Sequence, residues 1–298
     1  MNILITGGTG LLGNALVHHF LQHNHTVTVL SRSLDKVQQR FGSKVHAIGS
    51  LSDNTRHPVY NCIINLAGAG IFDTRWSSAR KQCLRDSRIE LTKNLIIFME
   101  QMPIKPQVFL SGSAIGIYGD QGDKIVSEQA PQGSDFSAQL CADWEAAALQ
   151  AEALGIRTCL LRTGLVLAHN GGFLQRMLPA FNMGLGGQLG SGLQWMPWVH
   201  YHDWLASVQW LIDSPTQHGA FNITSPHPVT NQEFTKQLAK ALHRPACCPV
   251  PSPVLHILLG ERAELLLGSQ RVLPTRLQEN GFTFTHEDLP TALAECVN

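Results

Sequence analysis

The chain has 298 residues, enough for one large α/β domain or for a nucleotide-binding domain with a smaller partner. Hydrophobic residues make up 44% of the chain and charged residues 15%, which provides ample material for a packed core. The 22 basic side chains balance 22 acidic ones. This balance argues against nucleic acid or a membrane surface as a partner, because proteins that bind either one carry an excess of basic residues.

An apolar strand at the start of the chain leads directly into a glycine turn. Residues 2–6 precede Gly7, Gly10 and Gly13, and apolar residues at helical spacing follow them. Strand, glycine turn and helix in this order are typical of a dinucleotide-binding βαβ unit, whose helix N-terminus faces the phosphates. We therefore predict that a pyrophosphate is held by Gly7, Thr9, Gly10, Leu11, Leu12 and Gly13.

Strands and helices alternate through the rest of the first half of the chain. The predicted strands span residues 26–30, 62–68 (with a second glycine turn), 108–111 and 157–161. The predicted helices between them span about 77–102 and 136–154. This alternation predicts a Rossmann-type α/β fold, a doubly wound parallel sheet with ligands at the carboxyl ends of its strands.

The second half has a different character. Residues 184–192 contain five glycines, which indicate a flexible or close-packing loop rather than a strand. Helical patterns follow at 231–243 and from about Val254. We predict a cofactor-binding domain over residues 1–170, with its sheet completed by segments within 195–225. Residues 171–298 then form mainly a smaller C-terminal substrate-binding lobe.

The end of the second strand bears on the choice of cofactor. NAD-preferring sites place an acidic residue there to bind the ribose hydroxyls. This chain has Ser31 and Arg32 instead. A guanidinium pairs with a 2′-phosphate and a hydroxyl donates to it, so these residues predict NADP as the cofactor. The alternative is that Arg32 is only a solvated surface residue.

Several motifs together resemble the extended short-chain dehydrogenases/reductases, in the epimerase-like YfcH branch of atypical members of the NAD(P)-dependent epimerase/dehydratase superfamily. The resemblance runs from residue 1 to about 285 and includes the glycine turn, residues 65–68, 162–167 and the glycine loop. It implies that Leu66, Ala67 and Gly68 lie beside the adenine-side ribose, and that Val166 lies at the nicotinamide end. Ordinary packing at the strand ends is the alternative for Leu66, Ala67 and Val166.

The resemblance also implies a catalytic Tyr-x-x-x-Lys pair, which this chain lacks. Counting back from Glu145, Ser137 stands in the tyrosine place and Cys141 in the lysine place. An alcohol is too basic to ionise near neutral pH, and a thiol provides no fixed positive charge. Ser113 matches the catalytic serine, and Arg88 stands where many extended members carry an asparagine that contacts the cofactor.

Tyr118 is the candidate that remains for proton transfer, because it follows a strand at its carboxyl end. A packed aromatic below the site is the alternative for this residue. His19 and His23 lie one helical turn apart, but no carboxylate or cysteine accompanies them. For His200, beside Trp198, we expect packing. The sequence thus predicts no metal site.

Two functions remain open. The first is an NADP-dependent oxidoreductase or epimerase that acts on a small polar or nucleotide-linked substrate, with Ser113 bonding the reacting oxygen. The second is a protein that binds NADP(H) without turnover, as a regulator or scaffold. Scattered cysteines, no membrane-length apolar run and no signal-peptide pattern predict a cytoplasmic protein. Family members often pair through two long helices, so a homodimer is conceivable.

Overall fold

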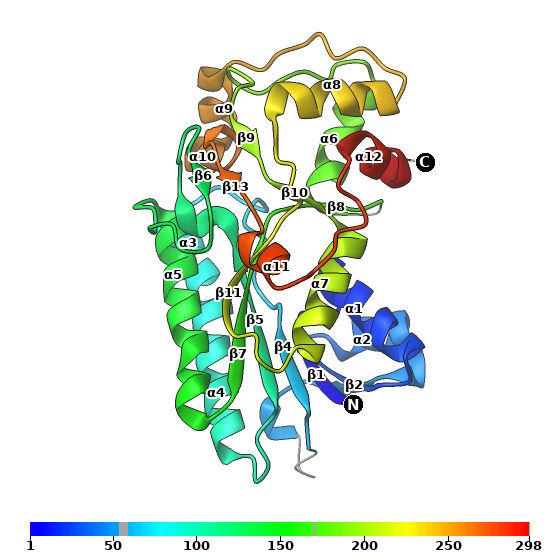
Figure 1. Cartoon of the computed structure of the whole chain (residues 1–298), viewed down its shortest axis with the longest axis vertical. Coiled ribbons are helices and arrows are strands. Elements are labelled where there is room, and N and C mark those ends of the chain that lie inside the picture. Colours follow the sequence, from blue (N-terminus) through cyan, green and yellow to red (C-terminus); the bar gives the residue numbers. More distant parts are fainter. Residues whose placement is uncertain (54–58, 170, 298) are drawn as a thin grey trace.

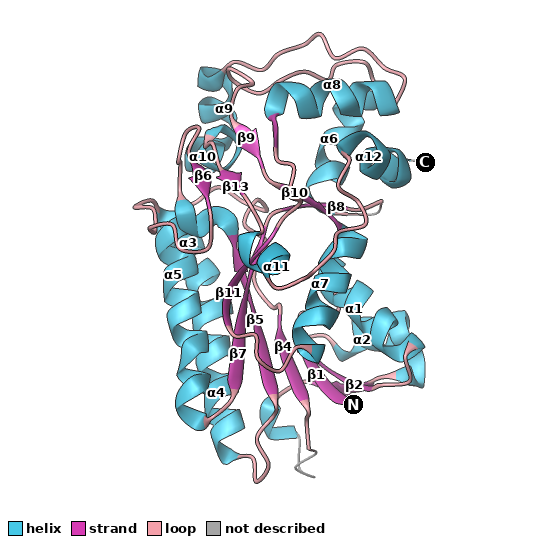
Figure 2. Cartoon of the chain, in the orientation of Figure 1, coloured by secondary structure: helices cyan, strands magenta, loops and turns pink. Residues whose placement is uncertain are grey.

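The computed structural model describes residues 1–53, 59–169 and 171–297. Within these ranges, seven parallel strands form the central sheet (Figures 1 and 2). Their spatial order is β11 (Gly219–Ile223), β7 (Arg157–Thr163), β5 (Val108–Ala114), β4 (Cys62–Asn65), β1 (Asn2–Thr6), β2 (Thr26–Leu30) and β3 (His46–Ile48). From β1 the chain builds outward to β3, then returns to β4 on the other side. The order therefore reverses between β1 and β4, which confirms the Rossmann-type α/β fold.

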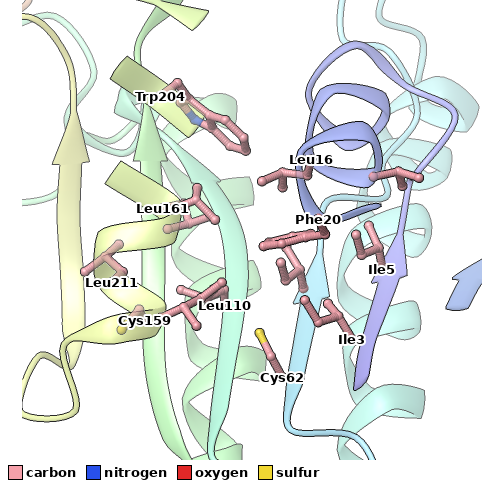
Figure 3. Packing of buried hydrophobic residues seen from close by; sticks show 14 of the residues in the cluster. Ile3, Ile5, Leu16, Phe20, Cys62, Leu110, Cys159, Leu161, Trp204 and Leu211 are labelled. Carbon is pink, nitrogen blue, oxygen red and sulfur yellow. The ribbon is translucent and has the colours of Figure 1, made fainter. Parts of the chain in front are cut away.

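Consecutive residues of each buried strand face opposite helical layers. Ile3 and Ile5 of β1 pack on one side, whereas Leu4 packs on the other. Figure 3 shows the first side, where Phe20 and Trp204 come from covering helices. The helices of this layer are α1 (Leu11–Gln22), α2 (Leu34–Phe41) and α7 (Tyr201–Asp213). Burial on both faces explains why the strands are almost continuously apolar.

The second layer contains α3 (Ser78–Arg85), α4 (Leu91–Gln101) and α5 (Phe136–Leu149). The long helix predicted over 77–102 is interrupted, because Asp86–Glu90 form a π-helical turn between α3 and α4. The helix predicted over 136–154 likewise ends as a 3₁₀ turn, Gln150–Leu154. The π turn carries Arg88, and π turns are frequent at functional sites.

A smaller lobe lies beyond the carboxyl ends of the sheet strands (Figure 1). Its apolar core includes Phe181, Trp198, Phe234 and Leu293. Its helices are α6 (Gly172–Asn182), α8 (Asn231–Ala241), α9 (Ser252–Leu259), α10 (Glu264–Leu267) and α12 (Leu289–Val297), whereas α11 (Thr275–Glu279) packs on β11 of the sheet. Two short strand pairs lie between it and the sheet domain: β8 (Leu165–Leu167) with β10 (Trp198–His200), and β6 (Ile125–Val126) with β13 (Arg271–Val272). A third pair, β9 (Trp195–Met196) with β12 (Val229–Thr230), lies within the lobe.

The glycine-rich loop 184–192 packs closely on another segment of the lobe. The Cys248 N–H donates to the Gly186 carbonyl at 3.0 Å, and the Gly190 N–H donates to the Val250 carbonyl at 2.8 Å. A Cβ added at Gly187 would lie 1.9 Å from the Cys248 carbonyl oxygen. These glycines therefore allow two backbones to approach each other, as the close-packing alternative requires.

Candidate functional site

A pocket of about 810 Å³ opens at the carboxyl ends of β1, β2 and β4, where the strand order reverses. Eight of the predicted cofactor residues line it: Gly7, Thr9, Gly10, Ser31, Arg32, Leu66, Ala67 and Gly68. Five others lie outside its lining: Leu11, Leu12, Gly13, Arg88 and Val166. The pocket therefore gathers Ser31, Arg32, the turn at 66–68 and the first half of the predicted pyrophosphate turn, but neither the start of α1 nor Val166.

The glycine turn takes a conformation that other residues do not easily adopt. Gly7 has φ +72°, and its carbonyl accepts from the Gly10 N–H at 2.9 Å. Helix α1 begins next, and Gly10 offers its N-terminus no capping side chain. The first turn of α1 also carries no acidic residue. Its free N–H groups and the positive end of its dipole therefore suit a phosphate.

The floor of the pocket is held by a chain of hydrogen bonds between β1 and β4. The Thr6 hydroxyl donates to Asn65 Oδ1 at 2.7 Å and accepts from the Ala67 N–H at 3.1 Å. The Asn65 amide then donates to the Thr92 hydroxyl on α4 at 2.8 Å. Since Thr6, Asn65 and Thr92 are fully buried, these bonds fix the relative position of the two strand ends.

The end of the pocket beside β2 and α2 carries positive charge that the sequence analysis only partly found. Arg32 lines it together with Lys36, in the first turn of α2. No carboxylate is present among the described residues of its lining. The Ser31 hydroxyl accepts from the Ser33 N–H at 3.2 Å, which ties the two serines into a tight turn. The signal by which Lys36 is recognisable in the sequence is a second basic residue shortly after Arg32, at the start of the helix that follows the second strand.

Arg88 lies behind the pocket wall. Its guanidinium donates to the carbonyls of Leu84 at 3.2 Å and Ala69 at 3.1 Å, and it lies 5.4 Å from the centre of the Trp144 ring. A Cβ on Gly68 would come within 2.8 Å of the guanidinium carbon. Arg88 therefore positions the turn at residues 68–69, which does line the pocket.

Both predicted catalytic residues belong to one buried polar network. The Ser113 hydroxyl donates to Glu145 at 2.6 Å, and Glu145 forms a two-pronged ion pair with Arg162 at 2.8 Å. Arg162 also donates to the Tyr118 hydroxyl at 2.9 Å, and Tyr118 donates to Asn222 at 2.6 Å. Glu145 and Arg162 thus connect Ser113 with Tyr118, a link that the sequence analysis missed.

The surroundings of Tyr118 and Cys141 keep both side chains in their neutral forms. Burial raises the pKa of Tyr118 to about 12, against the opposing effect of Arg162. Burial also raises the pKa of the Cys141 thiol to about 12. A neutral thiol is a poor nucleophile, so Cys141 acts as a small buried hydrophobic side chain. Tyr118 is fully buried, and its packing matches the alternative stated for it.

We expect Tyr118→Phe to change how stability depends on alkaline pH. The unfolded chain loses the tyrosine proton near pH 10 and the folded chain near pH 12. Stability from this group is thus fully present below about pH 10 and falls by about 1.4 kcal/mol per pH unit as the pH rises towards 12. Denaturant unfolding from pH 9 to 12 measures it. The variant should show the shallower fall, and equal slopes would contradict the assignment.

The fold, and the pocket at the switch point where the strand order reverses between β1 and β4, are those of a dinucleotide-binding α/β protein. Residues 3–224 match the NAD dependent epimerase/dehydratase family, and residues 250–296 match a domain of unknown function, DUF1731. The chain belongs to the NAD dependent epimerase/dehydratase family. This confirms the resemblance to atypical extended short-chain dehydrogenases/reductases.

Relatives share almost the whole length of the chain. The epimerase family protein SDR39U1 homolog, chloroplastic, of Arabidopsis thaliana is 37% identical over 98% of this chain and 86% of its own. The epimerase family protein Mb2239 of Mycobacterium bovis is 38% identical over 98% of this chain and 96% of its own. The crystal structure of human epimerase family protein SDR39U1 with NADPH superposes with a TM-score of 0.89 at 30% identity, over 99% of both chains.

Proposed function

We propose that this protein binds NADP(H) and acts as an oxidoreductase or epimerase on a small polar or nucleotide-linked substrate. The pocket at the switch point carries this proposal, because it combines a phosphate-binding glycine turn with Arg32 and Lys36. The glycine turn fits the cofactor because its backbone is packed too tightly for side chains and stays open to a phosphate. A Cβ at Gly7 or at Gly13 would meet backbone atoms within 2.8 Å. The similar human protein was solved with NADPH, which supports the same cofactor here.

Each part of the site has a role in this proposal. The glycine turn and the start of α1 hold the pyrophosphate, while Ser31, Arg32 and Lys36 bind the 2′-phosphate. The turn at 66–68 borders the adenine-side ribose. Val166, on β8, lies towards the nicotinamide end, and the bound cofactor supplies or accepts the hydride.

Ser113 is proposed to bond the reacting oxygen of the substrate. Its hydroxyl proton points to Glu145, which leaves the oxygen lone pairs to accept from a substrate hydroxyl. We assign the cofactor to residues 1–170 with β11, and the substrate mainly to residues 171–298. Tyr118 as the proton donor stays a prediction, which its burial and raised pKa do not favour.

The cofactor assignment is tested by Arg32→Ala and Lys36→Ala. Each variant removes a cation that we assign to the 2′-phosphate, so NADPH affinity should fall about 10- to 100-fold while NADH affinity stays unchanged. Titration of the two cofactors by fluorescence gives both dissociation constants. Lys44→Ala, an exposed lysine outside the pocket, is the matched control and should leave both unchanged. Equal losses for NADPH and NADH would remove the 2′-phosphate assignment.

The second candidate is an NADP(H)-binding protein that performs no turnover. Ser137 and Cys141 favour it, because they occupy the places of the catalytic tyrosine and lysine and lie next to each other beside Gly116. The two functions separate when the protein is mixed with NADPH or NADP⁺ and a wide panel of carbonyl compounds and sugar nucleotides. A change in cofactor absorbance or the formation of isomers supports the enzyme. Tight NADPH binding without either change supports the binding protein.

Compartment and assembly complete the proposal. No helix among the described residues is long and apolar enough to cross a membrane. All seven cysteines are free, which fits a reducing compartment, and we propose the cytoplasm. Pairing of two copies through α4 and α5 also stays a prediction, tested by measuring the mass in solution.

A further inference from the structure

Three histidines and a glutamate from distant parts of the chain meet where the lobe joins the sheet domain. His200 ends β10, His202 lies in the first turn of α7, His286 precedes α12, and Glu295 lies on α12. One ligand atom from each side chain lies within 4.8 Å of the other three. Imidazole nitrogens with a carboxylate oxygen form a donor set that suits zinc.

His200 is the residue in this cluster that points most clearly to a missing ligand. It is 1% exposed, and neither ring nitrogen has a hydrogen-bond partner among the described residues. Buried polar groups are almost always hydrogen-bonded, so such a ring requires an explanation. Its Nε2 lies 3.7 Å from the Glu295 carboxylate, too far for a hydrogen bond. Burial lowers the pKa of His200 to about 4, which keeps the imidazole in the neutral form that binds metals.

A second carboxylate lies behind His286, on the side where outer carboxylates stand in metal sites. The Asp203 carboxylate lies 3.4 Å from His286 Nδ1, which makes no hydrogen bond with the described residues. It is itself held by the backbone N–H groups of Thr285 at 2.9 Å and His286 at 2.8 Å. The other nitrogen of His286, Nε2, lies 3.1 Å from Glu295 inside the cluster. One ring nitrogen therefore faces the cluster while the other faces a fixed carboxylate.

The cluster needs only small side-chain movements to enclose a zinc ion. Ligand atoms around a tetrahedral zinc lie about 3.4 Å apart, given metal–nitrogen distances near 2.1 Å. The present separations reach 4.8 Å. His202 and Glu295 are exposed, so both are free to turn inward, and the rings of His200 and His286, whose centres lie 3.9 Å apart, must turn so that one nitrogen of each faces the ion.

We propose that His200, His202, His286 and Glu295 bind one zinc ion that clamps α12 to the start of α7. The ion would join the C-terminal segment, which matches DUF1731, to the sheet domain, which matches the epimerase family. Four protein ligands leave no open position, so the role is structural. The proposal is independent of the NADP(H) assignment, because no residue of the cluster lines the cofactor pocket.

The experiment titrates zinc chloride into chelator-treated full-length protein by calorimetry and follows the melting temperature. We expect one zinc ion per chain and a higher melting temperature in its presence. His202→Ala and Glu295→Gln, both at exposed positions, should each weaken binding at least about tenfold and remove the thermal shift. The matched controls are His256→Ala and Glu264→Gln, an exposed pair 3.9 Å apart elsewhere on the surface, which should bind as the native chain does.

Cobalt substitution identifies the ligands independently. Tetrahedral cobalt at this cluster should give visible absorption bands without a thiolate charge-transfer band, because its donors are nitrogen and oxygen. A thiolate band would place the metal on cysteines such as the adjacent Cys247 and Cys248, and would overturn the proposal. The absence of stoichiometric binding would do the same. The proposal would also be overturned if zinc binding survived in His202→Ala and in Glu295→Gln but was lost in the double variant His19→Ala/His23→Ala.

Discussion

Replacing Arg162 with alanine is expected to lower the free energy of unfolding by about 3–5 kcal/mol. The guanidinium makes a two-pronged ion pair with Glu145 and donates to both the Tyr118 hydroxyl and the Glu128 carbonyl. Burial alone would lower the pKa of Arg162, but the hydrogen bonds and charge of Glu145 outweigh burial and raise it. Without Arg162, a carboxylate stays buried with Ser113 as its remaining side-chain donor. Urea unfolding of the two proteins measures the difference.

Arg176→Ala is the matched control for Arg162→Ala. Arg176 pairs with Asp73 at 3.2 Å, but both side chains are more than half exposed. An exposed pair contributes at most about 1 kcal/mol, so this variant should unfold almost as the native protein does. Similar losses for the two arginines would show that burial of the Glu145 ion pair is unimportant, and that Ser113 and Tyr118 are not organised by it.

The sheet domain was largely predictable because its signals are local. The glycine turn and the strand at 26–30 were recognised from runs of a few residues, as was the loop 184–192 in the lobe, and the structure places each as expected. The π turn at Asp86–Glu90 was not predicted, because the apolar spacing of α3 and α4 continues through it. An inserted residue in a helix leaves little trace in a hydrophobic pattern.

The site was less predictable because its contacts depend on strand register and tertiary packing. Ser113 and Arg162 are opposite each other in the pairing of β5 with β7, and this register brings Glu145 between them. No local pattern contains such a pairing. His200 and His286 meet for the same reason, since the segment before α12 folds back on β10. Sequence motifs therefore identified the glycine turn between β1 and α1, but missed the groups that fix Ser113 and those that form the histidine cluster.

Gly13→Ala is expected to weaken NADPH binding more than 100-fold, a loss of about 3 kcal/mol, and to lower stability as well. In an ordinary helix interior a change from glycine to alanine stabilises a protein by about 0.5–1 kcal/mol. Here we expect the effect on stability to have the opposite sign. The added Cβ would lie 2.2 Å from the Gly7 carbonyl oxygen and 2.8 Å from Gly8 Cα. Both neighbours are backbone, so no side chain is able to move aside.

The turn has no room to retreat from the added methyl group. Gly7 already lies so close to the end of β4 that a Cβ there would be 2.8 Å from the Leu66 carbonyl and the Ala67 N–H nitrogen. The clash must therefore separate the turn from the start of α1, which is the arrangement that would bind the pyrophosphate. Gly42→Ala is the control, because a Cβ added at Gly42 meets nothing within 4 Å, although Gly42, unlike Gly13, lies at positive φ. It should lose some stability and keep its NADPH affinity. A folded Gly13→Ala protein with native affinity would show that the pyrophosphate does not bind at this turn.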